Sequence, residues 1–133
     1  MNVIQPDVVA IFNTSPDTVE MLRIVIEREG FVVVSAFTYD LRDAVVDLEA
    51  FVRQHHPRVV VYDIAPPYQE NWRLFQHICS LHELRRTRFV VTTTNIEQLR
   101  KVAGAEQREL YEFVGKPYDL GLIAAAVKQR IGE

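Results

Sequence analysis

Cysteine and histidine are scarce in this sequence of 133 residues, which contains one cysteine, Cys79, and four histidines. A single cysteine forms neither an internal disulfide nor a metal site built from several cysteines, so the chain suits a reducing compartment. Long apolar runs are also missing, and the first residues have neither the basic region nor the apolar stretch of a signal peptide. These absences predict a cytoplasmic protein that does not enter a membrane.

An excess of basic residues is missing as well. The sequence has 15 lysines and arginines against 18 aspartates and glutamates, for a formal net charge of −3. Domains that bind nucleic acids usually present a basic surface, so we expect no nucleic-acid partner. The local cluster Arg85-Arg86-Thr87-Arg88 is interpreted as a solvated turn.

The apolar content of the chain is sufficient for one domain, residues 1–133. Hydrophobic residues make up 48% of the sequence and charged residues 25%, which is typical of globular domains. Five short apolar runs bounded by polar or turn residues predict β-strands. These strands are expected at Asp7–Phe12, Phe31–Ala36, Arg58–Asp63, Phe89–Thr93 and Tyr111–Gly115.

Helical patterns lie between and after these runs. In the first of them, Ser15 before Pro16 is a typical helix start and Gly30 is a typical helix end. The alternation of strands and helices predicts an α/β fold, a doubly wound five-stranded parallel sheet with five helices. The helices are expected from Pro16 to Gly30, Asp40 to Gln54, Trp72 to Leu84, Asn95 to Gly104 and Leu120 to Ile131.

Asp63 closes the most uniformly apolar of the five runs. In an open parallel sheet, the carboxyl ends of the strands form the crevice that holds ligands. Other strands end near Asn13-Thr14, Thr93 and Lys116. The crevice is therefore expected to collect one carboxylate, several hydroxyls and one ammonium group.

Three sequence motifs at fixed spacings contribute residues to this crevice. Asp63 is followed four residues later by Pro67, Thr93 lies thirty residues after Asp63, and Phe113 precedes Gly115-Lys116-Pro117-Tyr118. With these motifs the chain resembles the response-regulator receiver domain of two-component signalling over essentially its whole length. The resemblance implies a flavodoxin-like sheet with strand order 2-1-3-4-5.

The resemblance also implies a role for each matched residue in phosphorelay signal transduction. Asp63 corresponds to the phosphoacceptor, Lys116 to the cation that neutralises the phosphoryl oxygens, and Thr93 to the hydroxyl that bonds the acyl phosphate. Thr93 and Phe113 correspond to the residues that switch conformation. Because nothing beyond autophosphorylation at Asp63 is implied, the chain is not expected to be an enzyme.

The chain departs from the family at the end of its first strand. There Asn13 and Thr14 replace two adjacent acidic residues that usually help to hold Mg²⁺. Mg²⁺ is held mainly by carboxylates in near-octahedral oxygen geometry, so weakened Mg²⁺ binding is expected, and no other cofactor. The remaining candidate ligands are Asp63, the backbone carbonyl of Ala65 and, more weakly, Asn13.

Three functional interpretations remain open. In the first, Asp63 is still phosphorylated, but inefficiently or with a higher demand for metal. In the second, Lys116 pairs permanently with Asp63, and the domain is a pseudo-receiver that binds proteins independently of phosphate. The third and least favoured is a flavodoxin-like binder of a flavin or another anion at residues 13–15, a loop that lacks glycine and is followed by Pro16, which has no amide donor.

The resemblance places the output surface on the helix after Asn95, the fifth strand and the last helix. The mixed charges of this surface suit pairing across a two-fold axis in a homodimer. The expected partners are a histidine kinase or phosphotransfer protein and a downstream signalling protein. The chain is expected to be a stand-alone receiver or one excised from a longer protein. The candidate surface residues are Arg100, Lys101, Glu112 and Lys128.

Overall fold

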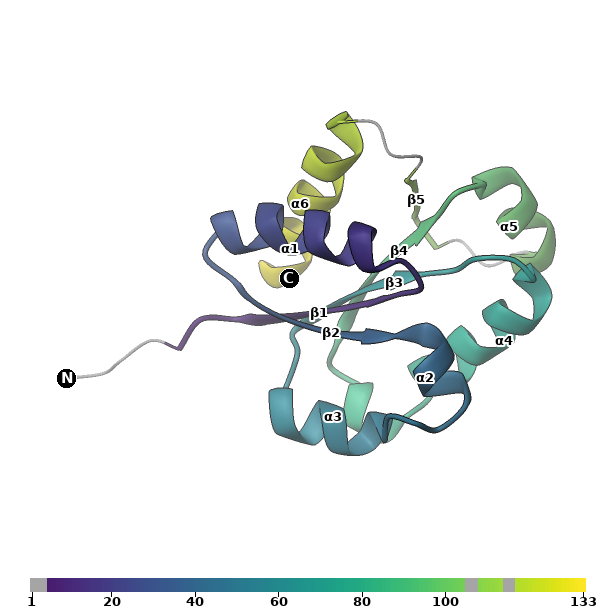
Figure 1. Cartoon of the computed structure of the whole chain (residues 1–133), viewed down its shortest axis with the longest axis horizontal. Helices are drawn as coiled ribbons and strands as arrows, with labels where there is room; N and C mark the ends of the chain where they lie inside the picture. Colours follow the sequence, from purple (N-terminus) through teal and green to yellow (C-terminus); the bar gives the residue numbers. More distant parts are fainter. Residues whose placement is uncertain (1–4, 105–107, 114–116) are drawn as a thin grey trace.

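Five parallel strands form a single sheet in the order β2-β1-β3-β4-β5 (Figure 1). The computed structural model describes residues 5–104, 108–113 and 117–133. The order confirms the flavodoxin-like arrangement, and the first four expected strands agree with the observed ones to within one residue at each end. The strands are β1 Val8–Asn13, β2 Val32–Phe37, β3 Val59–Asp63, β4 Arg88–Thr93 and β5 Leu110–Glu112.

Helices cover both faces of this sheet (Figure 1). The helices α1 and α6 lie on one face, and α3, α4 and α5 lie on the other, which is the doubly wound arrangement. Among the described residues there are six α-helices and one 3₁₀ turn. They are α1 Pro16–Arg28, α2 Thr38–Arg42, α3 Leu48–His55, α4 Tyr68–Cys79, η1 His82–Leu84, α5 Ile96–Ala103 and α6 Pro117–Ile131.

Local sequence signals set several helix ends as expected. The hydroxyl of Ser15 accepts from the backbone N–H of Thr18 at 3.2 Å, which caps α1. The side chain of Asn95 caps α5 in the same way, accepting from the N–H of Gln98 at 3.1 Å. Gly104 follows α5 with a φ of +65°, a backbone conformation that glycine adopts without a steric cost.

The single helix expected from Asp40 to Gln54 is wrong, because the chain divides there into α2 and α3. Ala44 has a φ of +58°, and a left-handed residue at this position interrupts a right-handed helix. Asp47 then starts α3, since its Oδ1 accepts from the N–H of Ala50 at 3.1 Å. As a result Val45 lies between the two helices and is 73% exposed.

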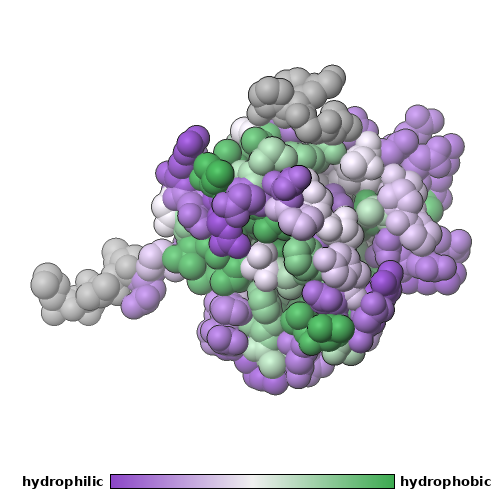
Figure 2. All heavy atoms as spheres, in the orientation of Figure 1, coloured by the Kyte–Doolittle hydropathy of each residue, from purple (hydrophilic) through white to green (hydrophobic). Residues whose placement is uncertain are grey.

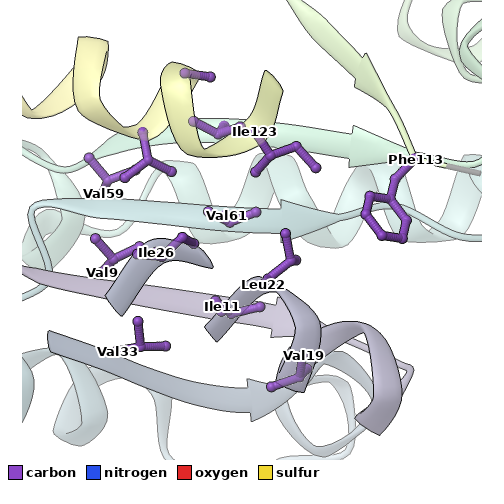
Figure 3. Packing of buried hydrophobic residues seen from close by; sticks show 13 residues of the cluster. Val9, Ile11, Val19, Leu22, Ile26, Val33, Val59, Val61, Phe113 and Ile123 are labelled. Carbon is purple, nitrogen blue, oxygen red and sulfur yellow. The ribbon is translucent and has the colours of Figure 1, made fainter. Parts of the chain in front are cut away.

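Two hydrophobic cores lie on opposite sides of the sheet. Figure 3 shows the core under α1 and α6, where Leu22 and Ile123 point toward the side chains of the central strands. The second core lies under α3, α4 and α5, and it includes Trp72 and Phe75 with ring centroids 5.3 Å apart. Because both faces are covered, the central strands β1 and β3 are apolar up to their last residues, Asn13 and Asp63. The sheet is thus a rigid platform that fixes the residues at its edges.

Exposed apolar surface is divided into small areas. On the face shown in Figure 2, hydrophobic residues lie in separate areas among hydrophilic ones. The exposed large apolar side chains include Ile24, Val32, Val45 and Leu122, which come from four different segments. In the described part of the chain, no helix is long and apolar enough to cross a bilayer.

Candidate functional site at the carboxyl edge of the sheet

Asp63 is the last residue of β3 and lies at the carboxyl edge of the sheet, where the strands end. Its neighbour in the register of β4 is Thr92, and the hydroxyl of Thr92 donates to Asp63 Oδ1 at 2.7 Å. Burial raises the pKa of the Asp63 carboxyl above its ordinary value, and the hydrogen bond from Thr92 lowers it in part. The surroundings of Asp63 therefore favour its neutral form more than water does.

Thr93, the threonine expected in the crevice, makes a different contact. Its side chain is fully buried, and its hydroxyl donates to the backbone carbonyl of Ile64 at 2.8 Å. Successive side chains of a strand point to opposite faces, so Thr92 and Thr93 project from opposite faces of β4. The role assigned to Thr93 stays a prediction. The hydroxyl that the structure brings to Asp63 is that of Thr92, which the sequence analysis missed. The pairing register of β3 and β4 is the signal that identifies it.

Asn13 is placed near the expected site, but its oxygen is already engaged. The residue ends β1 and is 4% exposed. Its Oδ1 accepts from the backbone N–H of Thr14 at 2.7 Å and from that of Ser15 at 3.0 Å. These bonds form a local turn that leads the chain from β1 into α1. Asn13 Oδ1, the atom that would bind a cation, is thus already used to shape the loop after β1.

The backbone carbonyl of Ala65 is also engaged. It accepts from the side-chain amide of Asn71 on α4 at 2.7 Å. Among the described residues, no three acidic, histidine or cysteine side chains are grouped as metal ligands. Asp63 is therefore not part of a group of three such ligands in this part of the chain, and the oxygens of Asn13 and Ala65 are already bonded to protein donors, which does not fit a strong Mg²⁺ site of the kind the resemblance implies.

Two further predicted site residues are Lys116 and Phe113. Lys116 lies outside the described residues. Phe113 is buried in the core under α1 and α6, where Figure 3 places its ring beyond the end of β3. Its backbone N–H donates to the carbonyl of Thr93 at 2.8 Å, which ties the end of β5 to β4. The switch role assigned to Phe113 stays a prediction.

Of the four candidate surface residues, two lie exposed on one helix and two are bonded to other elements of the chain. Arg100 and Lys101 are exposed on α5. Glu112 accepts from the backbone N–H of Ile96 at 3.1 Å, so it binds the first turn of α5. Lys128 lies 3.2 Å from a carboxylate oxygen of Glu29, across the contact between α1 and α6. Glu112 and Lys128 thus already join elements of this chain.

Solved structures with this fold align with almost the whole chain. Chemotaxis response regulator CheY4 of Vibrio cholerae is 18% identical, with a TM-score of 0.65 over 96% of this chain and 99% of its own. A response regulator from Thermotoga maritima is also 18% identical, with a TM-score of 0.64 over 97% of this chain and 100% of its own. A sensor protein from Polaromonas sp. JS666 is 17% identical, with a TM-score of 0.71 over 95% of this chain and 96% of its own.

No model of a known protein family matches the sequence, and no curated protein matches it. The strand order, the alternating helices and the alignment over nearly all residues agree with one another. The chain therefore has the fold of a response-regulator receiver domain.

Proposed function

We propose that the protein is a signalling module of the receiver type that binds protein partners without requiring phosphate on Asp63. The observation that carries this proposal is the set of oxygens around Asp63. Asn13 replaces an acidic residue, and its Oδ1 is bonded to two backbone amides. The carbonyl of Ala65 is bonded to Asn71. Phosphoryl transfer depends on neutralising charge around the transferred group, and this edge has few groups suited to holding a cation.

The hydrogen bond from Thr92 supports the same function, because it occupies one of the two carboxylate oxygens of Asp63 at 2.7 Å. An oxygen engaged in this way is less available to attack a phosphodonor.

Residual phosphorylation of Asp63 is the second candidate function. It is favoured by the position of Asp63 at the carboxyl edge, where the residue is partly exposed. In that case the protein is an ordinary switch with a high demand for Mg²⁺, and its donors are a histidine kinase or a phosphotransfer protein of a cytoplasmic phosphorelay.

Flavin or anion binding at the loop after β1 is not supported. The backbone amides of Thr14 and Ser15 donate to Asn13, and that of Thr18 donates to Ser15. A phosphate bound at this loop needs such amides for itself. Ordering of the loop by its own side chains leaves few donors for an anion.

The test is treatment with acetyl phosphate over a Mg²⁺ titration, followed by intact mass spectrometry. We expect the wild type to gain no more phosphate than Asp63→Asn, which lacks the nucleophile. The double variant Asn13→Asp with Thr14→Asp is the matched positive control, because it restores the acidic pair, and an aspartate at residue 13 still accepts from the same amides. Stoichiometric phosphorylation of the wild type at Asp63 would contradict the proposal and establish the switch.

A further inference from the structure

A second concentration of charge lies at the opposite edge of the sheet, where β3 and β4 begin. A cleft of about 540 Å³ opens there between the residues before β3, the turn after η1 and the end of α6. Five arginines line it against two glutamates, in a chain whose net charge is −3. We call it the arginine cleft. Its arginines are Arg58, Arg85, Arg86, Arg88 and Arg130.

The backbone that carries these arginines is held in place. The hydroxyl of Thr87 donates to the carbonyl of Pro57 at 3.2 Å, which joins the turn before β4 to the segment before β3. The N–H of Arg88 donates to the carbonyl of Arg58 at 3.0 Å. The N–H of Thr87 also donates to the carbonyl of Leu84 at 3.0 Å. The turn interpreted from sequence as merely solvated is therefore a fixed wall of the cleft.

The side chain of Glu133 marks a point where two guanidinium groups converge. One of its carboxylate oxygens lies 3.8 Å from Arg88 Nε, and the other lies 3.5 Å from Arg130 Nη1. A second carboxylate, that of Glu109, lies 3.2 Å from Arg130 Nη2 and keeps this arginine in position. An internal carboxylate thus occupies a place that suits an external anion.

The remaining positive charge of the cleft is incompletely neutralised. Arg58 pairs with Asp7 at 3.1 Å. Arg85 and Arg86 are exposed, and neither pairs with a carboxylate in the described part of the chain. Guanidinium groups bind phosphate oxygens in a fork geometry that no other side chain provides.

We infer that the arginine cleft binds a small anion that carries several phosphate groups. Its volume is within the usual range for small-molecule sites. None of its lining residues is phenylalanine, tyrosine or tryptophan, so it offers no aromatic stacking platform for a nucleobase. Recognition therefore rests on the phosphates alone. The site is independent of the proposed function, because Arg58 lies roughly 16 Å from Asp63 along β3.

The test is calorimetric titration of the whole chain with inorganic triphosphate, with ATP and sulfate titrated separately at the same ionic strength. We expect triphosphate and ATP to bind equally, and sulfate at least about tenfold more weakly, because it engages fewer of the guanidinium groups. Equal binding of triphosphate and sulfate, or binding of ATP without triphosphate, would overturn the inference.

Three variants assign the binding to the cleft. Arg85→Gln with Arg86→Gln should weaken triphosphate binding about tenfold or more, whereas Arg73→Gln, an exposed arginine on α4 outside the cleft, should leave it unchanged. Glu133→Gln should strengthen binding about threefold, because it removes the competing carboxylate. Circular dichroism verifies that each variant is folded. Unchanged affinity in the double variant, or an equal loss with Arg73→Gln, would refute the assignment.

Discussion

At the carboxyl edge of the sheet, the described polar groups are bonded in separate local pairs: Asp63 accepts from Thr92, Asn13 from the N–H of Thr14, and the carbonyl of Ala65 from Asn71. At the amino edge, five arginines line one cleft, and two of them lack a carboxylate partner among the described residues. The two edges are built on the same strands, so the difference comes from the residues that follow or precede each strand. The same fold thus carries one edge where the described polar groups are bonded within the chain and another edge lined by arginines.

Replacing Thr92 is expected to have the largest effect on stability. Thr92→Val keeps the shape of the side chain and removes the donor to Asp63, so a part-buried acceptor loses this hydrogen bond. We expect a loss of about 1–3 kcal/mol in the free energy of unfolding, measured by urea denaturation. Thr94→Val, at an exposed position two residues later, is the control and should change little. Equal effects of the two variants would show that the stability of the protein does not depend on the hydrogen bond between Thr92 and Asp63.

The burial of Asp63 at the carboxyl edge predicts a pH dependence of the free energy of unfolding. Burial raises the pKa of Asp63 in the folded chain above its ordinary value, so the folded state takes up a proton more readily than the unfolded state. The free energy of unfolding therefore falls as the pH rises from the pKa of Asp63 in the unfolded chain through its pKa in the folded chain. The destabilisation by Asp63 persists at neutral pH.

Asp63→Asn should remove this cost. We expect the variant to be more stable than the wild type at pH 7 by about 1 kcal/mol, the usual scale of a single substitution. The advantage should shrink as the pH falls toward 4, and thermal unfolding at several pH values measures it. If Asp63→Asn is less stable than the wild type at pH 7, the carboxylate is stabilised as an ion and the carboxyl edge is not neutral.

The smallest effect is expected at the amino edge. Arg86→Gln should change the free energy of unfolding by less than about 0.5 kcal/mol, because the residue is exposed and has no ion-pair partner within the described residues. Its effect should appear in anion binding instead. Strong destabilisation of Arg86→Gln would mean that the arginines serve the fold, and the contrast between the edges would disappear.

The strands were predictable from sequence because each is a short apolar run covered on both faces. The division between α2 and α3 was not, since Leu41, Leu48 and Val52 recur at helical spacing across the interruption at Ala44. Helical periodicity does not report a left-handed residue inside the pattern. The cap at Asp47 and the two β-branched residues before it were the available signals.

The candidate site was predictable in position and less so in its contacts. Asp63 lies at the edge expected for it, because the end of an apolar strand is visible in the sequence. Which of Thr92 and Thr93 bonds to Asp63 depends on which residues of β4 point to each face of the sheet. A run of three threonines gives no sequence pattern that decides this. The arginine cleft was missed because Arg58, Arg88 and Arg130 are far apart in sequence and meet only when parallel strands align their starts.

The carboxyl edge is expected to hold no divalent cation, and a Mg²⁺ titration of unfolding stability tests this most directly. A cation that binds only the folded state adds about 2.7 kcal/mol at a concentration one hundred times its Kd. We predict no Mg²⁺-dependent gain for the wild type beyond that of Asp63→Asn, and a clear gain for Asn13→Asp with Thr14→Asp. A gain in the wild type that Asp63→Asn abolishes would contradict the account.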